Sequence, residues 1–334
     1  MTVAYTPLRS PLTWYGGKGH LARRIVTLLP PHECYVEPCV GAGAVFWWKP
    51  RVALETINDL AGDVVHFYRV LRDPATFERF SRLAELTPYA REEFEHCRRA
   101  CHDADDPVER AWAWFVSVRQ AFGGATGAAA GEATRTGWRY SATAGATATT
   151  GVAGNWGYSA SNANGTRVSS AVRKYLGVVD RLPELHQRLQ GVQIERGDWR
   201  RVLAAYGHAG VCAYIDPPYV RETRRGDKRY AHEFTLADYH ALTAALLASP
   251  AMVVLSGYRH EAVHRPLEET GWERIDIDVP ISAARHREGL RRVESVWRNP
   301  AAVAAWERAQ AQPSLFAFEE IGQARDRGHH DPGR

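Results

Sequence analysis

The sequence has few cysteines and no long apolar run. Its five cysteines are an odd number and contain no Cys-x-x-Cys pair, which argues against a disulfide framework. No apolar stretch approaches the ~20 residues that cross a bilayer. The first residues, Met1–Tyr5, also lack the charged and then apolar layout of a signal peptide. We therefore expect a cytoplasmic protein with no membrane partner.

One group of Cys and His residues has a spacing that a metal site could use. His96-Cys97 and Cys101-His102 would meet one turn apart on a helix. An amphipathic helix that carries ordinary Cys and His residues accounts for the same spacing, and we favour it. The sequence is thus predicted to hold no metal.

Positive charge exceeds negative charge only slightly, but the basic residues are clustered. The net charge of +4 is compatible with a nucleic-acid partner and does not require one. Two basic clusters occur, one at Arg221, Arg224, Arg225, Lys228 and Arg229, and a second at Arg285, Arg287, Arg291 and Arg292. The first follows a turn that we interpret below as a base-binding turn, which favours a role in holding phosphates.

Apolar runs alternate with helical patterns over most of the chain. The predicted strands are 34–37, 52–57, 192–194, 211–215 and 251–256, the predicted helices include 60–71 and 235–247, and 273–279 and 293–297 form an antiparallel edge pair. Strands that alternate with helices indicate an α/β fold with a doubly wound, mostly parallel sheet.

A long segment interrupts this alternation. It begins with three helical patterns, at 75–84, 91–102 and 107–121, and ends with another at 169–189. Between them, 123–168 is rich in small and polar residues, which predicts a flexible excursion or disorder. We interpret 75–189 as a mainly helical inserted domain, 1–74 with 190–299 as the α/β domain, and 300–334 as a disordered tail.

Asp216-Pro217-Pro218-Tyr219 follows the apolar run Val211–Ile215. The two prolines fix φ and remove two donors, so the carbonyl groups there are expected to be unpaired acceptors. A carboxylate, a fixed carbonyl and an aromatic ring at one strand end could hold a planar amine by both hydrogens while the ring stacks on its base. The motif therefore indicates chemistry on a nucleobase amino group.

A glycine turn follows the first predicted strand. Glu37 ends that strand, and Gly41 and Gly43 allow a ligand to approach the backbone. Phe46 stands where a dinucleotide fingerprint requires glycine, so a nicotinamide cofactor is disfavoured. Asp59 ends the next strand, where α/β folds place a carboxylate on ribose hydroxyls. An acid, a glycine turn and a second acid suit a nucleoside with a zwitterionic tail, such as S-adenosylmethionine.

These motifs occur in an order that is similar to a known family. Trp14-Tyr15-Gly16-Gly17-Lys18, the Glu37 to Gly43 turn, Asn58-Asp59, a long insertion and Asp216-Pro217-Pro218-Tyr219 resemble the Dam-type, α-group DNA adenine-N6 methyltransferases. Tyr230–Phe234, Leu255–Tyr258 and Val293–Trp297 resemble the phage and prophage branch. The resemblance implies a Rossmann-like methyltransferase fold in which 75–189 is the target-recognition domain.

The resemblance also implies roles for individual residues. Trp14, Lys18, Asp59 and Asp216 would contact S-adenosylmethionine, Glu37, Gly41 and Gly43 would line its methionine end, and Asp198 would reach its adenine. Asp216 and the Pro217 carbonyl would hold the amino group of an adenine flipped out of double-stranded DNA, with Tyr219 stacked on the base. The first basic cluster would bind the flanking phosphates.

Other interpretations stay open at this stage. Cytosine N4 or an RNA adenine could be the target instead, although Asp rather than Ser before Pro217-Pro218 favours adenine. A non-catalytic DNA-binding protein on a methylase fold is a further alternative. Gln312-Pro313-Ser314-Leu315-Phe316 resembles the short peptide by which bacterial replication proteins bind the sliding clamp.

Overall fold

A seven-stranded mixed sheet forms the centre of the molecule. The computed structural model describes residues 6–14, 16–121, 170–219, 234–280 and 291–311. The strands are β1 (Cys34–Glu37), β2 (Leu54–Asp59), β3 (Gln193–Arg196), β4 (Val211–Ile215), β5 (Met252–Gly257), β6 (Glu273–Pro280) and β7 (Arg291–Arg298). Their order is β3-β2-β1-β4-β5-β7-β6, and β1 to β5 run parallel. β7 lies antiparallel between β5 and β6, so the predicted edge pair is confirmed.

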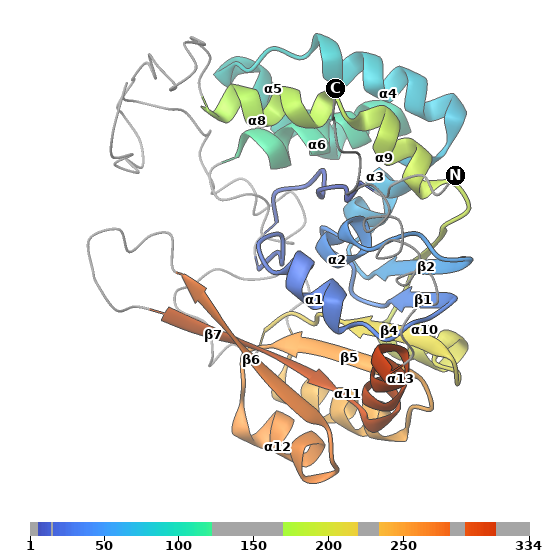
Figure 1. The fold of residues 1–334 in the computed structure, drawn as a ribbon. Coiled ribbons are helices and arrows are strands. Elements are labelled where there is room, and N and C mark those ends of the chain that lie inside the picture. Colours follow the sequence, from blue (N-terminus) through green and yellow to red (C-terminus); the bar gives the residue numbers. More distant parts are fainter. Residues whose placement is uncertain (1–5, 15, 122–169, 220–233, 281–290, 312–334) are drawn as a thin grey trace, which may run out of the picture.

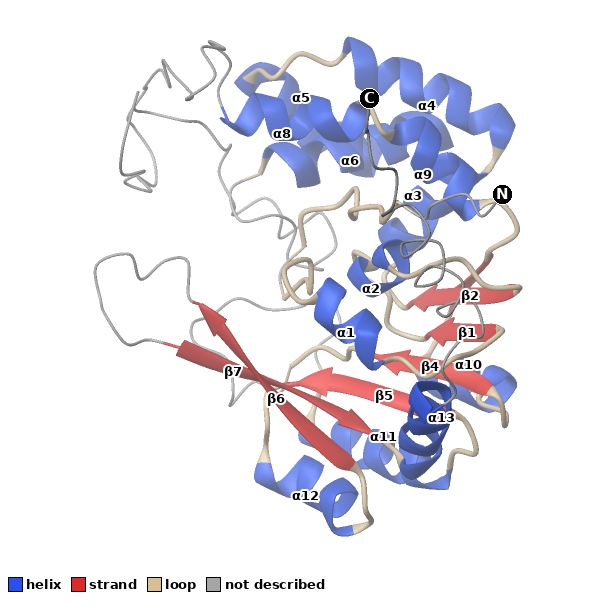
Figure 2. Cartoon of the chain, in the orientation of Figure 1, coloured by secondary structure: helices blue, strands red, loops and turns tan. Residues whose placement is uncertain are grey.

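Helices cover both faces of this sheet (Figure 2). One face carries α1 (Ala22–Leu28), α2 (Ala44–Trp48), α3 (Gly62–Arg72) and α13 (Pro300–Ala311), and the other carries α10 (Trp199–Tyr206), α11 (Leu236–Ala248) and α12 (Glu261–Glu269). α11 begins with a capping box that Thr235 and Asp238 form. The α/β fold with a doubly wound sheet is therefore confirmed.

The alternation of side chains along β4 explains why both faces need cover. Cys212 and Tyr214 belong to one apolar cluster, whereas Ala213 and Ile215 belong to a second cluster on the opposite face. All four are buried. A parallel strand that is buried on both sides has a continuous apolar sequence, as this one does.

The inserted segment lies between β2 and β3 and packs at one end of the sheet (Figure 1). Its described helices are α4 (Pro74–Leu86), α5 (Arg91–Asp103), α6 (Pro107–Gln120), α8 (Ser170–Val179) and α9 (Leu182–Leu189). Asp73 and Asp106 cap α4 and α6 by accepting hydrogen bonds from backbone N–H groups, and proline occupies the first turn of each. The three predicted helices are thus present, while 122–169, including the predicted flexible segment 123–168, lie outside the described residues.

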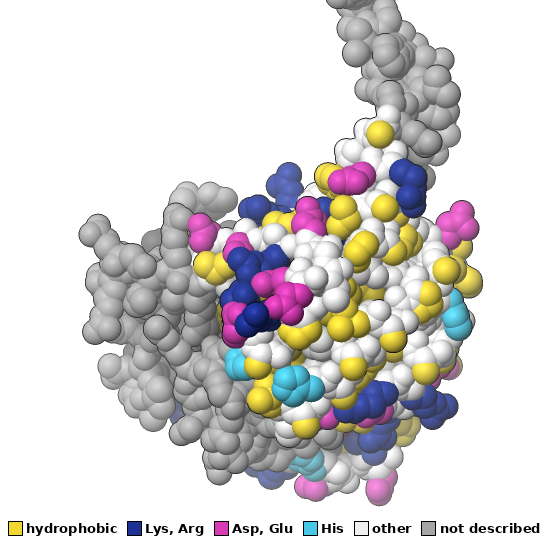
Figure 3. All heavy atoms as spheres, turned by 90° about the horizontal axis from the view of Figure 1, so that it is seen from below, with side chains coloured by type: hydrophobic (Ala, Val, Ile, Leu, Met, Phe, Trp, Pro, Cys, Tyr) yellow, Lys and Arg dark blue, Asp and Glu magenta, His cyan; other side chains and the backbone are white. Residues whose placement is uncertain are grey.

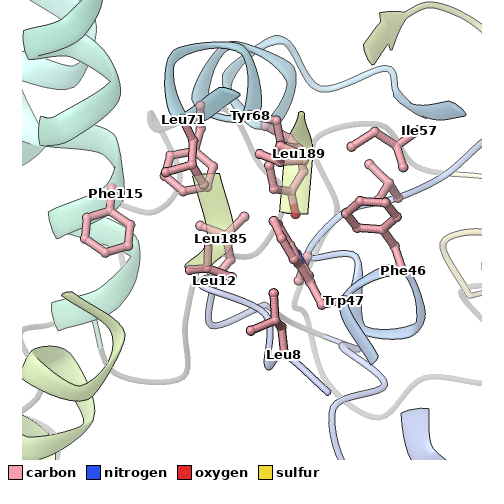
Figure 4. Close-up of a cluster of buried hydrophobic side chains, with 14 of the residues drawn as sticks. Leu8, Leu12, Phe46, Trp47, Ile57, Tyr68, Leu71, Phe115, Leu185 and Leu189 are labelled. Carbon is pink, nitrogen blue, oxygen red and sulfur yellow. The ribbon is translucent and has the colours of Figure 1, made fainter. Parts of the chain in front are cut away.

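The insert and the sheet share a hydrophobic cluster (Figure 4). Phe115 of α6 and Leu185 and Leu189 of α9 belong to the same cluster as Trp47 of α2 and Ile57 of β2. The inserted helices are therefore packed onto the α/β layers through buried apolar side chains. The division into two domains stays a prediction.

The predicted disorder of 300–334 is wrong for residues 300–311, which form α13. Asn299 explains the helix start: its Oδ1 accepts a hydrogen bond from the Ala302 N–H (2.9 Å), and its Nδ2 donates to the Ala251 carbonyl. Ala302 is fully buried against the sheet. The remaining residues of the predicted tail lie outside the described part of the chain.

Within the described ranges, no helix combines the length and the apolar character that crossing a membrane requires.

Candidate active site

A cavity opens at the point where the strand order reverses. β1 and β4 are neighbours in the sheet, but their helical connections leave in opposite directions, and ligands of doubly wound folds bind at this switch point. The cavity measures about 910 Å³ including its open mouth. The candidate cofactor and catalytic residues that line it are Trp14, Lys18, Glu37, Gly41, Gly43, Asp59, Asp216, Pro217 and Tyr219.

Glu37, at the end of β1, contributes a buried acid to the cavity. Its Oε2 accepts a hydrogen bond from the Tyr35 hydroxyl at 2.7 Å. Burial raises the pKa of Glu37 to about 8, and the hydrogen bond from Tyr35 only partly opposes this rise. At neutral pH the side chain is therefore largely a protonated acid. A cationic group placed beside it would favour its ionised form.

The glycine turn after β1 has a conformation that L side chains rarely adopt. Gly41 and Gly43 have φ values of +47° and +63°. A Cβ atom on Gly41 would lie 3.0 Å from Nε1 of Trp14, so a side chain there would push against the indole that lines the cavity. Gly41 is required both by its backbone angles and by this close approach.

Asp59, at the end of β2, is held by backbone donors. Its Oδ2 accepts a hydrogen bond from the Gly41 N–H (2.7 Å), and its Oδ1 accepts one from the Ala61 N–H (2.8 Å). The carboxylate thus joins the ends of β1 and β2. It also lines the cavity, so the predicted ribose-binding position is compatible with the structure.

On the opposite side of the cavity, Asp216 follows β4. Its Oδ1 accepts hydrogen bonds from the Lys18 ammonium at 2.5 Å and from the Ser256 hydroxyl at 3.2 Å. Burial raises the pKa of Asp216, and Lys18 limits that rise. No described residue donates a hydrogen bond to Oδ2. One oxygen of the carboxylate is therefore anchored, and the other stays open to a ligand.

The two prolines of the motif differ in their surroundings. Pro217 lines the cavity. The carbonyl of Pro218 accepts a hydrogen bond from the Tyr239 hydroxyl at 2.7 Å. The expectation of unpaired carbonyls is therefore wrong for Pro218, because Tyr239 of α11 reaches back to the motif.

Tyr219 is more enclosed than the sequence predicted. Its hydroxyl donates to Oε1 of Glu294 at 2.8 Å and also forms a hydrogen bond with Lys18. Its ring lies 4.5 Å from that of Tyr258, and only 6% of the residue is exposed. A stacking role would require a face of this ring to become uncovered, so that role stays a prediction.

Asp198 lies beside the cavity, and its contact with the adenine of the cofactor stays a prediction. Gly197 and Trp199 line the cavity, but Asp198 does not. Its carboxylate caps α10 by accepting from the Arg200 N–H, and it also pairs with the Arg200 guanidinium at 3.0 Å. Asp198 therefore has a structural role as a helix cap, in addition to the ligand contact predicted for it.

Glu294 contacts two residues of the cavity, Lys18 and Tyr219, although no motif predicted a role for it. It lies in β7, is almost fully buried, and its Oε1 is 3.3 Å from the Lys18 nitrogen. Burial alone would lower the pKa of Lys18, but Asp216 and Glu294 together raise it well above its ordinary value. An acid inside the apolar strand pattern Val293–Trp297 was a usable signal, since an ionised side chain is rarely buried without a partner.

Several predicted features cannot be placed. The basic residues Arg221, Arg224, Arg225, Lys228 and Arg229, and the peptide Gln312–Phe316, lie outside the described residues. Among the described residues, no group of three or more His, Cys, Asp or Glu side chains could hold a metal ion. Cys97 and Cys101 are buried on α5 as free thiols.

The strand order, with a cavity at its switch point, defines a doubly wound α/β protein. Within that class, residues 14–130 match the family model of the D12 class N6 adenine-specific DNA methyltransferases. This matched region contains the Trp14 to Lys18 segment, the glycine turn and Asp59, but it ends before β4.

Curated relatives point to the same family. The chain is 32% identical over 125 residues to the DNA adenine methylases of Salmonella typhi and of Salmonella typhimurium strain LT2, and 31% identical to that of Escherichia coli strain K12. Each match covers 35% of this chain and 42% of the relative. The chain thus aligns with less than half the length of these relatives. The resemblance to Dam-type methyltransferases is confirmed, while the phage and prophage branch stays a prediction.

Proposed function

We propose that this protein transfers a methyl group from S-adenosylmethionine to N6 of an adenine in DNA. One observation carries the proposal: Asp216, after β4, lines the same cavity as the Gly41–Gly43 turn after β1. The two parts of the sequence that suggested a nucleobase amine and a nucleoside cofactor are thus neighbours. The names of the matched family and relatives agree with this chemistry.

The cofactor side of the cavity fits S-adenosylmethionine chemically. Glu37 would face the α-ammonium group and Asp59 the ribose, while the glycine turn leaves room where a Cβ atom would meet Trp14. When bound, S-adenosylmethionine supplies a methyl group activated by its sulfonium. An ammonium group beside Glu37 would oppose the effect of burial on its pKa and favour the carboxylate.

Asp216 would act on the amino group. The N6 lone pair is delocalised into the adenine ring, which makes this nitrogen a poor nucleophile. Oδ2 of Asp216 and the carbonyl of Pro217 would each accept one N6 hydrogen and so favour a pyramidal nitrogen whose lone pair is directed at the methyl group. These hydrogen bonds strengthen as N6 gains positive charge, so they stabilise the transition state more than the ground state.

The DNA would approach the cavity from a side other than that of α12. Figure 3 views the molecule from the α12 side and shows basic and acidic side chains next to one another. Arg259 pairs there with Glu261 and Glu268, and Arg274 also pairs with Glu268. Such a mixed surface does not attract a polyanion. We assign phosphate binding to the cluster Arg221–Arg229 instead, and target recognition to the insert 75–189.

Replacement of Asp216 tests the proposed function. We expect Asp216→Asn to lower the rate of methyl transfer at least 100-fold, as loss of one preorganised charge-stabilising group does, while S-adenosylmethionine and DNA still bind. Asp180→Asn removes an exposed acid far from the cavity and serves as the control. Tritiated methyl transfer gives the rate, and titration calorimetry gives the affinities.

Mass spectrometry of nucleosides from methylated substrates identifies the target. N6-methyladenine from duplex DNA supports the proposal, whereas N4-methylcytosine, or methyl transfer to RNA alone, would replace it with the alternative substrates. Binding of DNA without binding of S-adenosylmethionine would indicate a non-catalytic protein. The clamp-binding peptide Gln312–Phe316 remains a separate prediction, tested by whether its deletion changes co-elution with a sliding clamp.

A further inference from the structure

Three buried residues, Lys18, Tyr219 and Glu294, form one connected group with the partly exposed Asp216. Lys18 forms hydrogen bonds with Asp216 and Tyr219, and Tyr219 donates to Glu294. The Lys18 nitrogen is also 3.3 Å from Glu294. The group thus contains two carboxylates and a single ammonium, so one negative charge is not balanced within it.

This surplus charge matters because Asp216 is the proposed acceptor of the substrate amine. A carboxylate that is paired one-to-one with a buried ammonium is largely neutralised and attracts a developing positive charge only weakly. Glu294 changes that balance, because the same ammonium also lies beside a second carboxylate. The field of Asp216 toward the open cavity is therefore stronger than that of a simple ion pair.

Glu294 also restrains the geometry of the site. It is fixed in β7, whose residues pair with β5 and β6, and 3% of it is exposed. One of its carboxylate oxygens, Oε1, contacts both the Tyr219 hydroxyl and the Lys18 ammonium. Lys18 in turn binds Oδ1 of Asp216, which leaves Oδ2 open. The orientation of the Asp216 carboxylate thus depends on Glu294 through Lys18.

We propose that Glu294 is a positioning residue for methyl transfer. It holds Lys18 and Tyr219 in place, and its charge leaves the group of Lys18, Asp216 and Glu294 with a net negative charge. The inference rests on the proposed function. Glu294 acts through Lys18 and Tyr219 and does not touch the substrate. We expect its effect on the rate of transfer to exceed its effect on cofactor binding, because Lys18 links it to Asp216, the proposed acceptor of the substrate amine.

Glu294→Gln separates charge from hydrogen bonding. The amide oxygen still accepts from the Tyr219 hydroxyl, but the negative charge beside Lys18 is lost. We expect the single-turnover rate to fall at least tenfold while the Kd of S-adenosylmethionine changes less than threefold. Asp276→Asn, on the neighbouring strand β6, removes a half-exposed carboxylate that contacts Ser295 and is the matched control.

The pH profile distinguishes positioning from a merely structural role. Burial and the charge of Glu294 raise the pKa of Asp216, whereas Lys18 and the Ser256 hydroxyl lower it. The other titratable groups that face this pair of acids are His20, near Glu294, and Glu37 and Tyr214, near Asp216. In the pH profile of the single-turnover rate, the acidic limb of Glu294→Gln should therefore lie at lower pH than that of the wild type. The plateau of the profile should also be lower. An unchanged plateau, or a lower plateau with an unmoved acidic limb in a folded variant, would overturn the inference.

A stability cycle tests the contact without any activity measurement. Lys18→Met removes the ammonium that lies beside two carboxylates, Asp216 and Glu294, in the wild type but beside Asp216 alone in Glu294→Gln. The unfolding equilibrium constant should therefore rise at least tenfold more in the wild-type background, and additive effects would contradict the contact. If the wild type forms no N6-methyladenine, the proposed function fails, yet this cycle still decides whether Glu294 is coupled to Lys18.

Discussion

Glu37 shows how one buried acid makes stability depend on pH. In the folded protein its pKa is about 8, compared with an ordinary value of 4.5, so the folded state binds a proton that the unfolded state has released between these values. The free energy of unfolding should therefore decrease as pH rises through this range, by at most about 1.4 kcal/mol per pH unit. Below pH 4.5 both states are protonated, and the dependence on Glu37 disappears.

Glu37→Gln should remove this contribution. The amide carries no charge at any pH in the range, so the variant should gain stability relative to the wild type as pH rises from 5 to 8. Urea unfolding followed by circular dichroism at several pH values measures the difference. Glu78→Gln, at an exposed position of α4, is the control. Parallel curves for the wild type and Glu37→Gln would show that Glu37 is ionised in the folded protein.

At the scale of elements, α6 supports the cavity from outside it. Trp114 of α6 lies 6.3 Å from Trp14, measured between ring centroids, and Trp14 lines the cavity. Arg119 of the same helix donates a hydrogen bond to Thr13 at 3.0 Å. The insert therefore touches the segment that carries two candidate cofactor residues, Trp14 and Lys18.

Trp114→Ala should weaken cofactor binding although Trp114 does not line the cavity. Loss of the indole leaves Trp14 without its neighbour, so we expect the Kd of S-adenosylmethionine to rise about tenfold. Trp112→Ala is the matched control, because it removes a second buried indole from α6 that donates to Thr87 and contacts His96. Both variants should lose about 3 kcal/mol of stability. Equal cofactor affinities in titration calorimetry would show that α6 has no influence on the cavity.

The elements that carry the site could be predicted because their signals are local. The apolar run of β4 ends at Asp216, and the run of β1 ends at Glu37. In a parallel sheet these ends share one edge, so their residues meet even though about 180 positions separate them in the sequence. The turn at Gly41 and Gly43 was predictable in the same way, because only glycine adopts the observed φ values freely.

Features that depend on distant partners could not be predicted. An acid after Gly197 suits both ligand binding and helix capping, and the sequence did not predict the pairing of Asp198 with Arg200 and of Arg200 with Asp238. The enclosure of Tyr219 requires Glu294 of β7 and Tyr258, whose positions the local sequence does not specify. The helix formed by residues 300–311 likewise depends on the burial of Ala302 against the sheet.

At the scale of the whole molecule, a buried charge network joins the insert to the sheet. Arg188 of α9 binds both oxygens of Glu55 in β2, at 2.5 and 2.8 Å, and Lys49 binds the same carboxylate at 2.6 Å. Burial would raise the pKa of Glu55, but these two cations hold it below its ordinary value. All three side chains are at least nine-tenths buried. Together with the shared apolar cluster, this network should make the insert and the α/β layers unfold as one unit.

Arg188→Met tests that expectation. It leaves Glu55 with one cation in place of two and removes the link from α9, so the free energy of unfolding should fall by about 3 kcal/mol. Arg181→Met, at the start of the same helix, breaks a solvent-exposed pair with Glu184 and should cost less than about 1 kcal/mol. Urea unfolding followed by circular dichroism and by tryptophan fluorescence should give coincident single transitions for the wild type and for both variants. Two separate transitions in the wild type would mean that the insert folds independently. Equal stabilities of the two variants would mean that the Arg188–Glu55 pair does not stabilise the contact between the insert and the α/β layers.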